Sequence, residues 1–428
     1  MKKYFLLLLS FLSKQIIKRH KPFVVGVTWT VGKTTVTNFV YEFLKWIYSS
    51  EVYKSEYDYN WEFWLPLSIL QSKSPNKNPL LWIKLLFKFI ILYFSRSYPK
   101  YLVLEYWIDR PNEMEFLTDI VCPDIWIVLN VTPNHVTQFP EYSDYIYQKV
   151  LLWLKARKVI YNKDYSELCD RFDSIKSSIS YSILSKDSKV YANNIVSDLS
   201  WIKFNLFASG QSYDLSFSLL WDHQVYNILP VFALWLALDI SPDIVYDYIR
   251  NIDAQKWRWT ILKWISDSII LDWSYNWWLL SISSWVKYIW SLNSPSYKKV
   301  LFLWDMRELW PESKKCHSEL AQIIKDYDFD YIALVWEEMK IHVFDQLVSH
   351  FWKDKVFISK SSKISGDEIR NFILANWQSI VYVKGSQNTI FLEEWIKKLL
   401  FDMKDYNKLC RQSEKWLSIK ESFYSHII

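Results

Sequence analysis

The sequence predicts an α/β protein whose two domains each contain a largely parallel sheet. Short apolar segments typical of buried strands alternate with segments of helical periodicity along most of the 428 residues. Such alternation is typical of parallel strands connected by helices. It pauses near residues 252–259 and then begins again. We therefore expect an apolar and basic segment at 1–21, a central domain at 22–254, and a Rossmann-like α/β domain at 255–428.

The central domain opens with a strand, a loop and a helix start that fit a phosphate-binding loop. Apolar residues 23–27 lead into the segment from Gly26 to Thr34, which satisfies G-x-x-x-x-G-K-[ST]. In such a loop the backbone N–H groups bind phosphates, Lys33 reaches the β- and γ-phosphates, and the Thr34 hydroxyl holds Mg²⁺. We therefore expect a P-loop ATPase domain. The residues expected around the phosphates are Gly26, Thr28, Thr30, Gly32, Lys33, Thr34 and Thr35.

Trp29 departs from this loop, because the backbone there must pass close to a phosphate, where glycine is the usual residue. The chain holds 26 tryptophans and only 5 glycines. Together they make up about 7% of the residues, which is the ordinary share of glycine alone. Tryptophan also stands at turn-like places such as Trp61, Trp107 and Trp273. We interpret most of these residues as native glycines, as would follow if UGA encodes glycine in the source organism; the alternative is a truly tryptophan-rich protein.

Composition excludes several classes of partner and site. The net charge of +5 gives no polybasic stretch of the kind that binds nucleic acid. The four cysteines form no C-x-x-C pair, which argues against a zinc site and for a reducing compartment. We therefore expect a cytoplasmic protein that acts on small molecules and binds no nucleic acid.

The first residues predict a docked amphipathic helix. Residues 4–12 are apolar, no small-residue cleavage site follows them, and Lys14, Lys18 and Arg19 come next. The apolar run is too short to span a bilayer. At most we expect weak contact with the inner membrane surface. Residues 80–94 are also apolar, but Lys84 and Lys88 interrupt them and indicate a surface or docked helix.

Polar residues follow two of the predicted strands. Glu105 ends the buried strand 101–105, and residues 132–135, which include His135, follow the buried strand 125–131. The carboxyl ends of parallel strands meet at one edge of a sheet, where α/β proteins place ligand-binding groups. We therefore expect ligand-binding side chains at these strand ends.

Taken together, these segments resemble the Mur ligase family of ATP-dependent amide-forming ligases. Trp29 replaces a glycine of the family's phosphate loop, and Lys149 falls where the family has a carbamylated lysine, fourteen residues after His135. Four segments of the central domain are similar to motifs of the family. Residues 26–35 are similar to G-x-T-G-T-x-G-K-T-T, and residues 104–107 are similar to L-E-x-G. Residues 130–135 are similar to N-[IV]-x-x-[DA]-H, and residues 222–227 are similar to G-x-H-N-x-x-N.

The C-terminal domain carries four further motifs of the family branch that adds a D-alanyl-D-alanine dipeptide. They are 257–259, similar to G-R-G; 271–276, similar to D-D-S-Y-N; 303–310, similar to G-D-M-x-E-L-G and followed by His317; and 383–386, which matches K-G-S. The resemblance covers about residues 23–400.

The resemblance implies a ligase of peptidoglycan precursor synthesis. Its cofactors would be ATP and Mg²⁺: ATP phosphorylates a carboxylate, and an amine attacks the acyl phosphate to give an amide, ADP and phosphate. The implied catalytic residues are Lys33, His135, Lys149 and Lys384. The implied nucleotide contacts beyond the loop are Asn227, Arg258, Asp272 and Asn276. The implied metal ligands are Thr34, Glu105, His135 and a carbamylated Lys149.

Alternatives remain for each residue and for the whole chain. Glu105 can be an ordinary strand-end carboxylate, His135 a structural histidine, and Lys149 a solvated helix lysine. About twenty residues precede the loop, where the family has a UDP-binding domain, and Gln387 replaces an arginine after K-G-S. The chain can thus be a ligase for another carboxylate and amine, or a non-catalytic P-loop partner protein. We expect a monomer.

Overall fold

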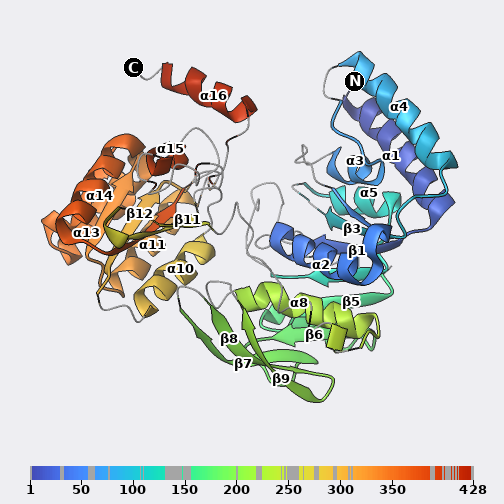
Figure 1. The fold of residues 1–428 in the computed structure, drawn as a ribbon, viewed down its shortest axis with the longest axis horizontal. Helices are drawn as coiled ribbons and strands as arrows, with labels where there is room; N and C mark the ends of the chain where they lie inside the picture. The colour runs from blue at the N-terminus through green and yellow to red at the C-terminus, as the bar shows by residue number, and fades with distance from the viewer. Residues whose placement is uncertain are drawn as a thin grey trace. The chain divides into compact units, whose positions relative to one another are not determined.

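The computed structural model divides the chain into two compact units, which we describe one at a time (Figure 1). The N-terminal unit comprises Met1–Ser197, Trp201–Ser218 and Asp222–Ile252, and the C-terminal unit comprises Asp198–Ser200, Leu219–Trp221 and Asp253–Ile428. The structure describes residues 2–28, 33–55, 63–75, 78–106, 108, 110–130, 147, 156–198, 201–217, 224–241, 243–244, 247, 260–263, 265–273, 279–292, 296–306, 309, 312–385, 391–397, 400, 406, 409, 412 and 414–425.

The N-terminal unit is built on a sheet that has nine strands among the described residues, in the order β2-β3-β1-β4-β5-β6-β7-β8-β9. The strands from β2 to β7 pair in parallel, and β7, β8 and β9 pair antiparallel. Their bounds are β1 (Phe23–Thr28), β2 (Val52–Lys54), β3 (Tyr101–Tyr106), β4 (Ile125–Val128), β5 (Lys158–Asn162), β6 (Ser178–Ser182), β7 (Val190–Ser197), β8 (Ile202–Ala208) and β9 (Gln211–Phe217).

Helices cover this sheet because its central strands are apolar along their whole length. Both β3 and β4 are made of residues that are buried or nearly so, which is typical of parallel strands covered on two faces. Helices α2 and α8 pack together against the sheet, and Figure 1 shows α3 and α5 across β1 and β3 from α2. The helix bounds are α1 (Lys2–His20), α2 (Lys33–Tyr48), η1 (Ser49–Glu51), α3 (Trp64–Ile69), α4 (Pro79–Phe94), α5 (Glu113–Ile120), α7 (Ser166–Phe172) and α8 (Gln224–Ala237).

The docked helix predicted at the N-terminus is present as α1. Leu9, Leu12 and Ile16 recur at helical spacing on one side of α1 and are fully or almost fully buried. Helix α4 lies against α1. In the part of the chain that the structure describes, no helix combines the length and the apolarity that crossing a membrane requires.

The C-terminal unit contains a sheet with six described strands in the order β10-β11-β15-β12-β13-β14. All neighbours are parallel except β10 and β11. The strand bounds are β10 (Thr260–Lys263), β11 (Ile269–Trp273), β12 (Lys298–Trp304), β13 (Tyr331–Val335), β14 (Val356–Ser359) and β15 (Ser379–Lys384). The helix bounds are η5 (Ile265–Asp267), α10 (Leu279–Ser291), α11 (Ser313–Lys325), α12 (Glu337–Met339), η6 (Lys340–Phe344), α13 (Asp345–His350), η7 (Lys353–Lys355), α14 (Ser362–Asn376), α15 (Leu392–Lys397) and α16 (Glu414–Ser425).

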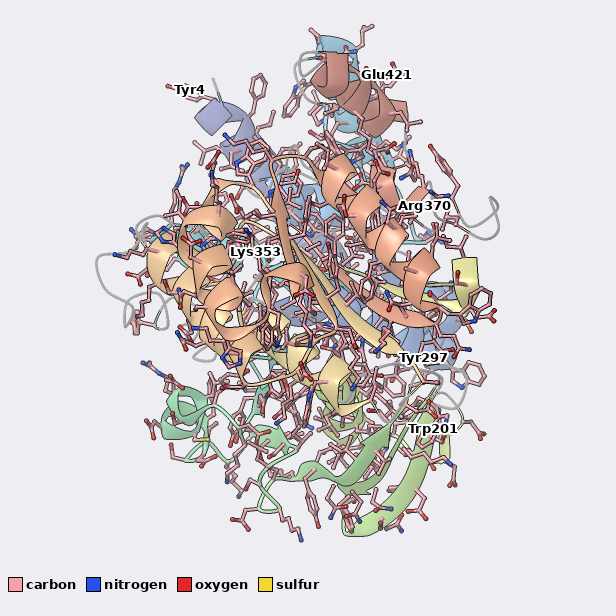
Figure 2. The ribbon with its side chains drawn as sticks, turned by 90° about the vertical axis from the view of Figure 1, so that its left-hand side faces the viewer. Tyr4, Trp201, Tyr297, Lys353, Arg370 and Glu421 are labelled. Carbon is pink, nitrogen blue, oxygen red and sulfur yellow. The ribbon has the colours of Figure 1, made fainter. Side chains whose placement is uncertain are left out.

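Two cores lie on the two faces of this sheet, as expected of a doubly wound domain. Alternate residues of β12 enter different cores: Leu301 and Leu303 join one, and Phe302 joins the other. This is the two-residue period of a strand. The first core includes residues of α10 and α11, and the second includes residues of α14, whose Arg370 is on the exposed side (Figure 2). Two α/β units with largely parallel sheets confirm the predicted fold class.

Two tryptophans of the C-terminal unit have backbone conformations that L-residues rarely adopt. Trp336 has φ 89° and ψ −180°, and Trp377 has φ 55° and ψ 166°. Both pairs of angles lie in or near a region occupied almost only by glycine. Trp377 follows the last turn of α14, and its N–H donates to the Ile373 carbonyl at 2.9 Å. Glycine is the usual residue just after a helix because it avoids the steric cost at positive φ.

We predict that Trp377→Gly stabilises the protein. The Trp377 side chain is 59% exposed, so little packing is lost, while relief of the backbone strain is worth roughly 1–3 kcal/mol. Trp352→Gly is the matched control, because Trp352 is 79% exposed but has an ordinary φ of −66°. Urea unfolding should show a higher midpoint for Trp377→Gly and an unchanged or lower one for Trp352→Gly. A lower midpoint for both variants would contradict the prediction.

Candidate active site at the strand ends

The phosphate-loop sequence stands where β1 ends and α2 begins. Gly26 and Thr28 belong to β1, the described part of α2 starts at Lys33, and Thr35 is buried. Gly26 is required by packing, since a Cβ there would lie 2.6 Å from the ring of Trp126. A strand before residues 29–32 and a helix after them agree with the predicted motif. Residues 29–32, including Trp29, Thr30 and Gly32, lie outside the described residues, as do the side chains of Lys33 and Thr34.

Three polar residues stand at the carboxyl edge of the neighbouring strands β3, β1 and β4. Glu105 is buried near the end of β3 and is in register with Val27 of β1. The Thr28 hydroxyl donates to the Tyr106 carbonyl at 3.2 Å, which joins the ends of β1 and β3. Asn130 is buried just beyond β4. The fold therefore brings the strand-end carboxylate next to the strand that leads into the phosphate loop.

Asn227 lies in the first turns of α8, which contacts β4 and β5. It is buried, and its amide donates to the Gln224 side-chain oxygen at 2.9 Å. Its structural neighbour is thus Gln224, one of the residues in which the sequence departs from the family motif. The other predicted residues of the central domain, His135 and Lys149, lie outside the described residues.

The C-terminal unit has a second set of polar residues at the carboxyl edge of its sheet. Asp272 on β11 pairs in register with Val383 of β15, and Lys384 ends β15. Asp305 follows directly after β12, which is the neighbour of β15 on the other side. All three side chains are buried. Asp272 and Lys384 were predicted as site residues, and the fold places them on adjacent strands; Arg258 and Asn276 lie outside the described residues.

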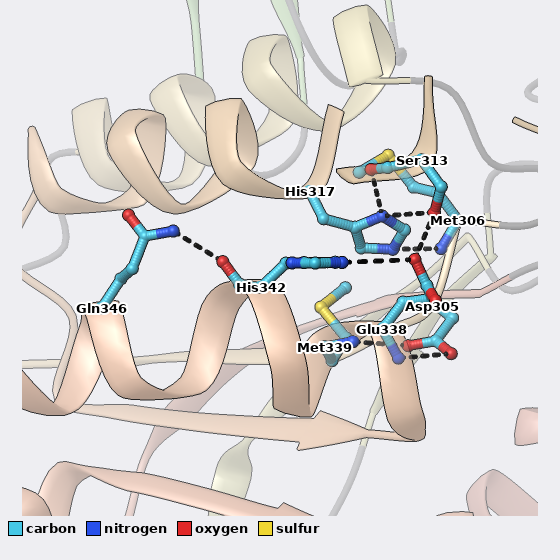
Figure 3. Close-up of polar contacts among 8 residues, drawn as sticks. All are labelled: Asp305, Met306, Ser313, His317, Glu338, Met339, His342 and Gln346. Atoms are coloured by element: carbon cyan, nitrogen blue, oxygen red, sulfur yellow. Dashed lines mark hydrogen bonds and ion pairs between the residues drawn. The ribbon is translucent and has the colours of Figure 1, made fainter. Parts of the chain in front are cut away.

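Asp305 begins a hydrogen-bond network that the sequence analysis did not predict (Figure 3). Its carboxylate accepts from the backbone N–H groups of Glu338 at 3.1 Å and Met339 at 2.8 Å. A carboxylate that accepts from the first N–H groups of a helix satisfies donors that have no partner within the helix. Asp305 therefore holds the end of β12 against the start of α12. The segment similar to G-D-M-x-E-L-G marked Asp305 as part of a family motif, but it did not reveal which groups the Asp305 carboxylate would bind.

His317 of α11 completes the network. The Met306 N–H donates to its Nε2 at 2.9 Å, so Nε2 carries no proton and Nδ1–H donates to the Ser313 carbonyl at 2.8 Å. The Ser313 hydroxyl in turn donates to the Glu338 carboxylate. Burial lowers the pKa of His317, although the Ser313 carbonyl and the Glu338 carboxylate act in the opposite direction. A neutral His317 is thus part of the folded state, and its role is to position the loop after β12.

An ion pair between α15 and α16 was also not predicted. Lys420 lies 2.7 Å from Glu393 and 2.6 Å from Glu394, and the side chains of Lys420 and Glu393 are buried. The two helices are separated by residues that carry no recognisable motif, so nothing in the sequence pairs these charges. The pair fixes α16 to the C-terminal unit.

Comparisons with known proteins agree with this geometry. Residues 27–235 match the Mur ligase middle domain. The chain is 24% identical over 337 residues to the UDP-N-acetylmuramoyl-tripeptide–D-alanyl-D-alanine ligase of Borreliella burgdorferi, covering 77% of this chain and 66% of that protein. It is 22% identical over 308 residues to the enzyme of the same name from Buchnera aphidicola, covering 70% and 64%. The match thus spans just under two thirds of the length of these relatives.

A solved structure extends the likeness to both units. The MurF ligase of Thermotoga maritima in complex with ADP has a TM-score of 0.74 at 16% identity, covering 94% of this chain and 84% of that chain. At this identity the likeness establishes a shared fold. It includes the described sheets of both the N-terminal and the C-terminal units.

We predict that His317 makes stability depend on pH. The folded state lowers the pKa of His317 below its unfolded value of about 6.5, so below that pH the unfolded state binds more protons and stability falls as the pH falls. His317→Phe should cost about 1–3 kcal/mol at neutral pH, because the Met306 N–H loses its acceptor.

Urea unfolding between pH 8 and pH 5 measures both effects. The difference in stability between wild type and His317→Phe should shrink on acidification. His350→Phe, a surface change in the same unit, serves as the control and should keep the wild-type pH dependence. A constant difference between wild type and His317→Phe would show that His317 does not titrate with folding.

Proposed function

We propose that the protein is an ATP-dependent ligase that forms an amide bond in peptidoglycan precursor synthesis, because residues 27–235 match the Mur ligase middle domain. The observation that carries this proposal is the carboxyl edge of β3, β1 and β4. There a buried carboxylate, Glu105, stands beside the strand that leads into the phosphate loop. A second α/β unit with Lys384 and Asp272 at its own strand ends supports the same activity.

The donor set of the N-terminal unit fits Mg²⁺. Magnesium is usually bound by one or two carboxylates together with phosphate oxygens and water. Glu105 and the Thr34 hydroxyl would supply the protein ligands, with His135 and a carbamylated Lys149 for a second ion. Bound Mg²⁺ would neutralise charge on the transferred phosphoryl group.

The proposed reaction has two steps, both of which need positive charge close to phosphate. In the first, a carboxylate oxygen of the substrate attacks the γ-phosphorus of ATP, and the bond to ADP breaks. In the second, an amine attacks the carbonyl carbon of the acyl phosphate, phosphate leaves, and the amine gives up a proton. We assign Lys33 and Lys384 to the phosphate oxygens, and Asn227, Arg258, Asp272 and Asn276 to the nucleotide.

The substrates are proposed from the relatives. Their names state that a D-alanyl-D-alanine unit is joined to a UDP-linked tripeptide, so we propose the same dipeptide as the amine component. Gln387 stands where the family has an arginine, which favours a change in how the amine component's own carboxylate is bound. The second candidate is therefore a ligase for a related pair of substrates.

We propose that the protein acts as a monomer in the cytoplasm, with contact to the membrane surface.

We also propose that most tryptophans of the chain are glycines in the native protein. Support comes from the glycine-like backbone of Trp336 and Trp377. Further support comes from Trp304, whose buried indole N–H group has no hydrogen-bond acceptor in the described part of the chain. A buried donor without an acceptor costs about 1–3 kcal/mol. The same exchange would restore glycine at position 29, where the phosphate loop requires it.

Mass spectrometry of the protein isolated from its source organism tests this exchange. We expect glycine at position 29 in the peptide spanning Val24 to Lys33. We also expect glycine at position 336 in the tryptic peptide from Asp326 to Lys340. Tryptophan and glycine differ so much in mass that the peptide mass shows which of the two residues is present. Tryptophan at both positions would refute the proposal and favour a P-loop protein without ligase activity.

The ligase proposal is tested with protein that carries the residues found by mass spectrometry. ATP turnover should require both a wall-precursor carboxylate and D-alanyl-D-alanine. Glu105→Gln should reduce this turnover roughly a hundredfold or more, because Mg²⁺ loses an anionic ligand and the charge on the transferred phosphoryl group is less well neutralised. Glu42→Gln, an exposed change on α2, is the matched control and should leave turnover unchanged. Turnover that ignores the amine, or full activity of Glu105→Gln, would argue against the proposal.

A further inference from the structure

Helices α1 and α4 expose a broad apolar surface, which we call the α1–α4 face. It is represented by Tyr4, Leu7 and Phe11 on α1 and by Phe87, Ile91 and Phe94 on α4, whose side chains are between 51% and 77% exposed. Each set recurs at three- or four-residue intervals and so forms a stripe along its helix. Figure 2 shows Tyr4 near the outer end of α1.

The two helices form a single surface because they contact each other along their length. The rings of Phe5 and Trp82 stack with their centroids 4.4 Å apart near one end of the pair. Near the other end, the His20 imidazole Nε2 lies 2.9 Å from the Leu92 carbonyl oxygen. Figure 1 shows α4 running beside α1. The face is thus held in place by α1, which is anchored in the core.

Helix α4 is unusually apolar for a helix whose surface is exposed to water. All sixteen of its residues are described, and of these Leu85 alone is buried. A surface helix of a soluble protein normally turns its apolar residues to the core and its polar residues to water. Contiguous apolar surfaces of this kind mark sites of interaction. The helix therefore requires a partner on its outer side.

The charges around the face indicate which partner. Residues 2–20 and 79–94 contain no aspartate or glutamate, while Lys18, Arg19 and Lys84 are exposed on the two helices. Lys88 donates to the Gln71 carbonyl, and burial lowers the pKa of the Lys88 ammonium group below its ordinary value. Lys14 of α1 pairs with Asp119 of the neighbouring helix α5, and the other exposed cations leave the rim of the apolar surface net positive, which complements anionic lipid headgroups. A second copy of this chain would present the same positive charge and be repelled.

The geometry also decides how such a surface would meet a bilayer. At 1.5 Å per residue, α4 is roughly 24 Å long, which is less than the hydrocarbon thickness of about 30 Å. Its cations lie within the helix rather than at its ends, so an orientation across the membrane would bury them. A helix that lies in the plane of the interface keeps the exposed Lys84 among the headgroups and its apolar stripe below them.

We propose that the α1–α4 face docks the protein on an anionic lipid bilayer, with both helices in the plane of the interface. This names the partner for the membrane contact proposed above, and it does not depend on the ligase reaction. Binding to lipid and turnover of ATP are separate measurements, so failure of one leaves the other intact.

Flotation of the full chain with phosphatidylcholine vesicles, with and without phosphatidylglycerol, tests the proposal. We expect binding to the phosphatidylglycerol vesicles that weakens with added salt. The triple variant Phe87→Gln, Ile91→Gln and Phe94→Gln should bind at least about tenfold more weakly, since apolar burial provides much of the affinity. Glutamine keeps the helix propensity, and the replaced side chains are exposed, so the fold is retained. The matched control replaces exposed apolar residues elsewhere, Leu184→Gln, Ile341→Gln and Trp352→Gln, and should bind as the wild type does.

A second variant tests the charges alone. Lys18→Gln with Lys84→Gln leaves every apolar residue in place and should weaken binding to anionic vesicles severalfold, with no effect on vesicles of phosphatidylcholine. Three results would overturn the proposal: no flotation of the wild type with anionic vesicles, equal flotation of the wild type and the triple variant, or a concentration-dependent dimer that the triple variant abolishes. The last result would assign the face to a second copy of the chain.

Discussion

The parallel pairing of β1 with β3 and β4 is the constraint on which the N-terminal unit depends. Strands that are covered on both faces leave no room for polar side chains along their length, so polar groups collect where the strands end. Parallel pairing brings those ends to a single edge. Glu105, Thr28 and Asn130 meet this edge from three neighbouring strands. The sheet of the C-terminal unit obeys the same constraint with Asp272, Lys384 and Asp305.

Two glycines of the chain pack directly against tryptophan rings. Gly26 lies under Trp126, so close that any side chain at position 26 would collide with the indole ring. Gly366 has the same relation to Trp395, where a Cβ would lie 1.7 Å from the ring. These two rings fill space that glycine leaves. Trp377 is different, because its strained backbone is independent of any packing gain. Backbone angles therefore separate the tryptophans that a glycine would relieve from those whose removal would leave a cavity.

Much of the fold could be predicted because it depends on local patterns. The alternation of apolar strands and periodic helices predicted two α/β units, and the end of a buried strand predicted that Glu105 stands at the carboxyl edge of the sheet. The roles of Asp305 and His317 could not be predicted. They join β12, α11 and α12 through backbone groups that have no sequence signature. The ion pair of Lys420 with Glu393 was missed for the same reason.

The exposure of α4 shows another limit of sequence patterns. An apolar run with two lysines is compatible with burial in a core, with a surface helix and with docking on a partner, because periodicity records which residues share a side but not what covers it. The fold resolves this: α1 supplies all the buried residues of the pair except Leu85, and α4 lies outside α1. Helices pack on the faces of a parallel sheet, whereas its ligand groups stand at the edge. A lipid-binding pair of helices on one face therefore leaves the carboxyl edge of β3, β1 and β4 open to nucleotide and substrates, so the two activities can share one unit without competing for the same surface.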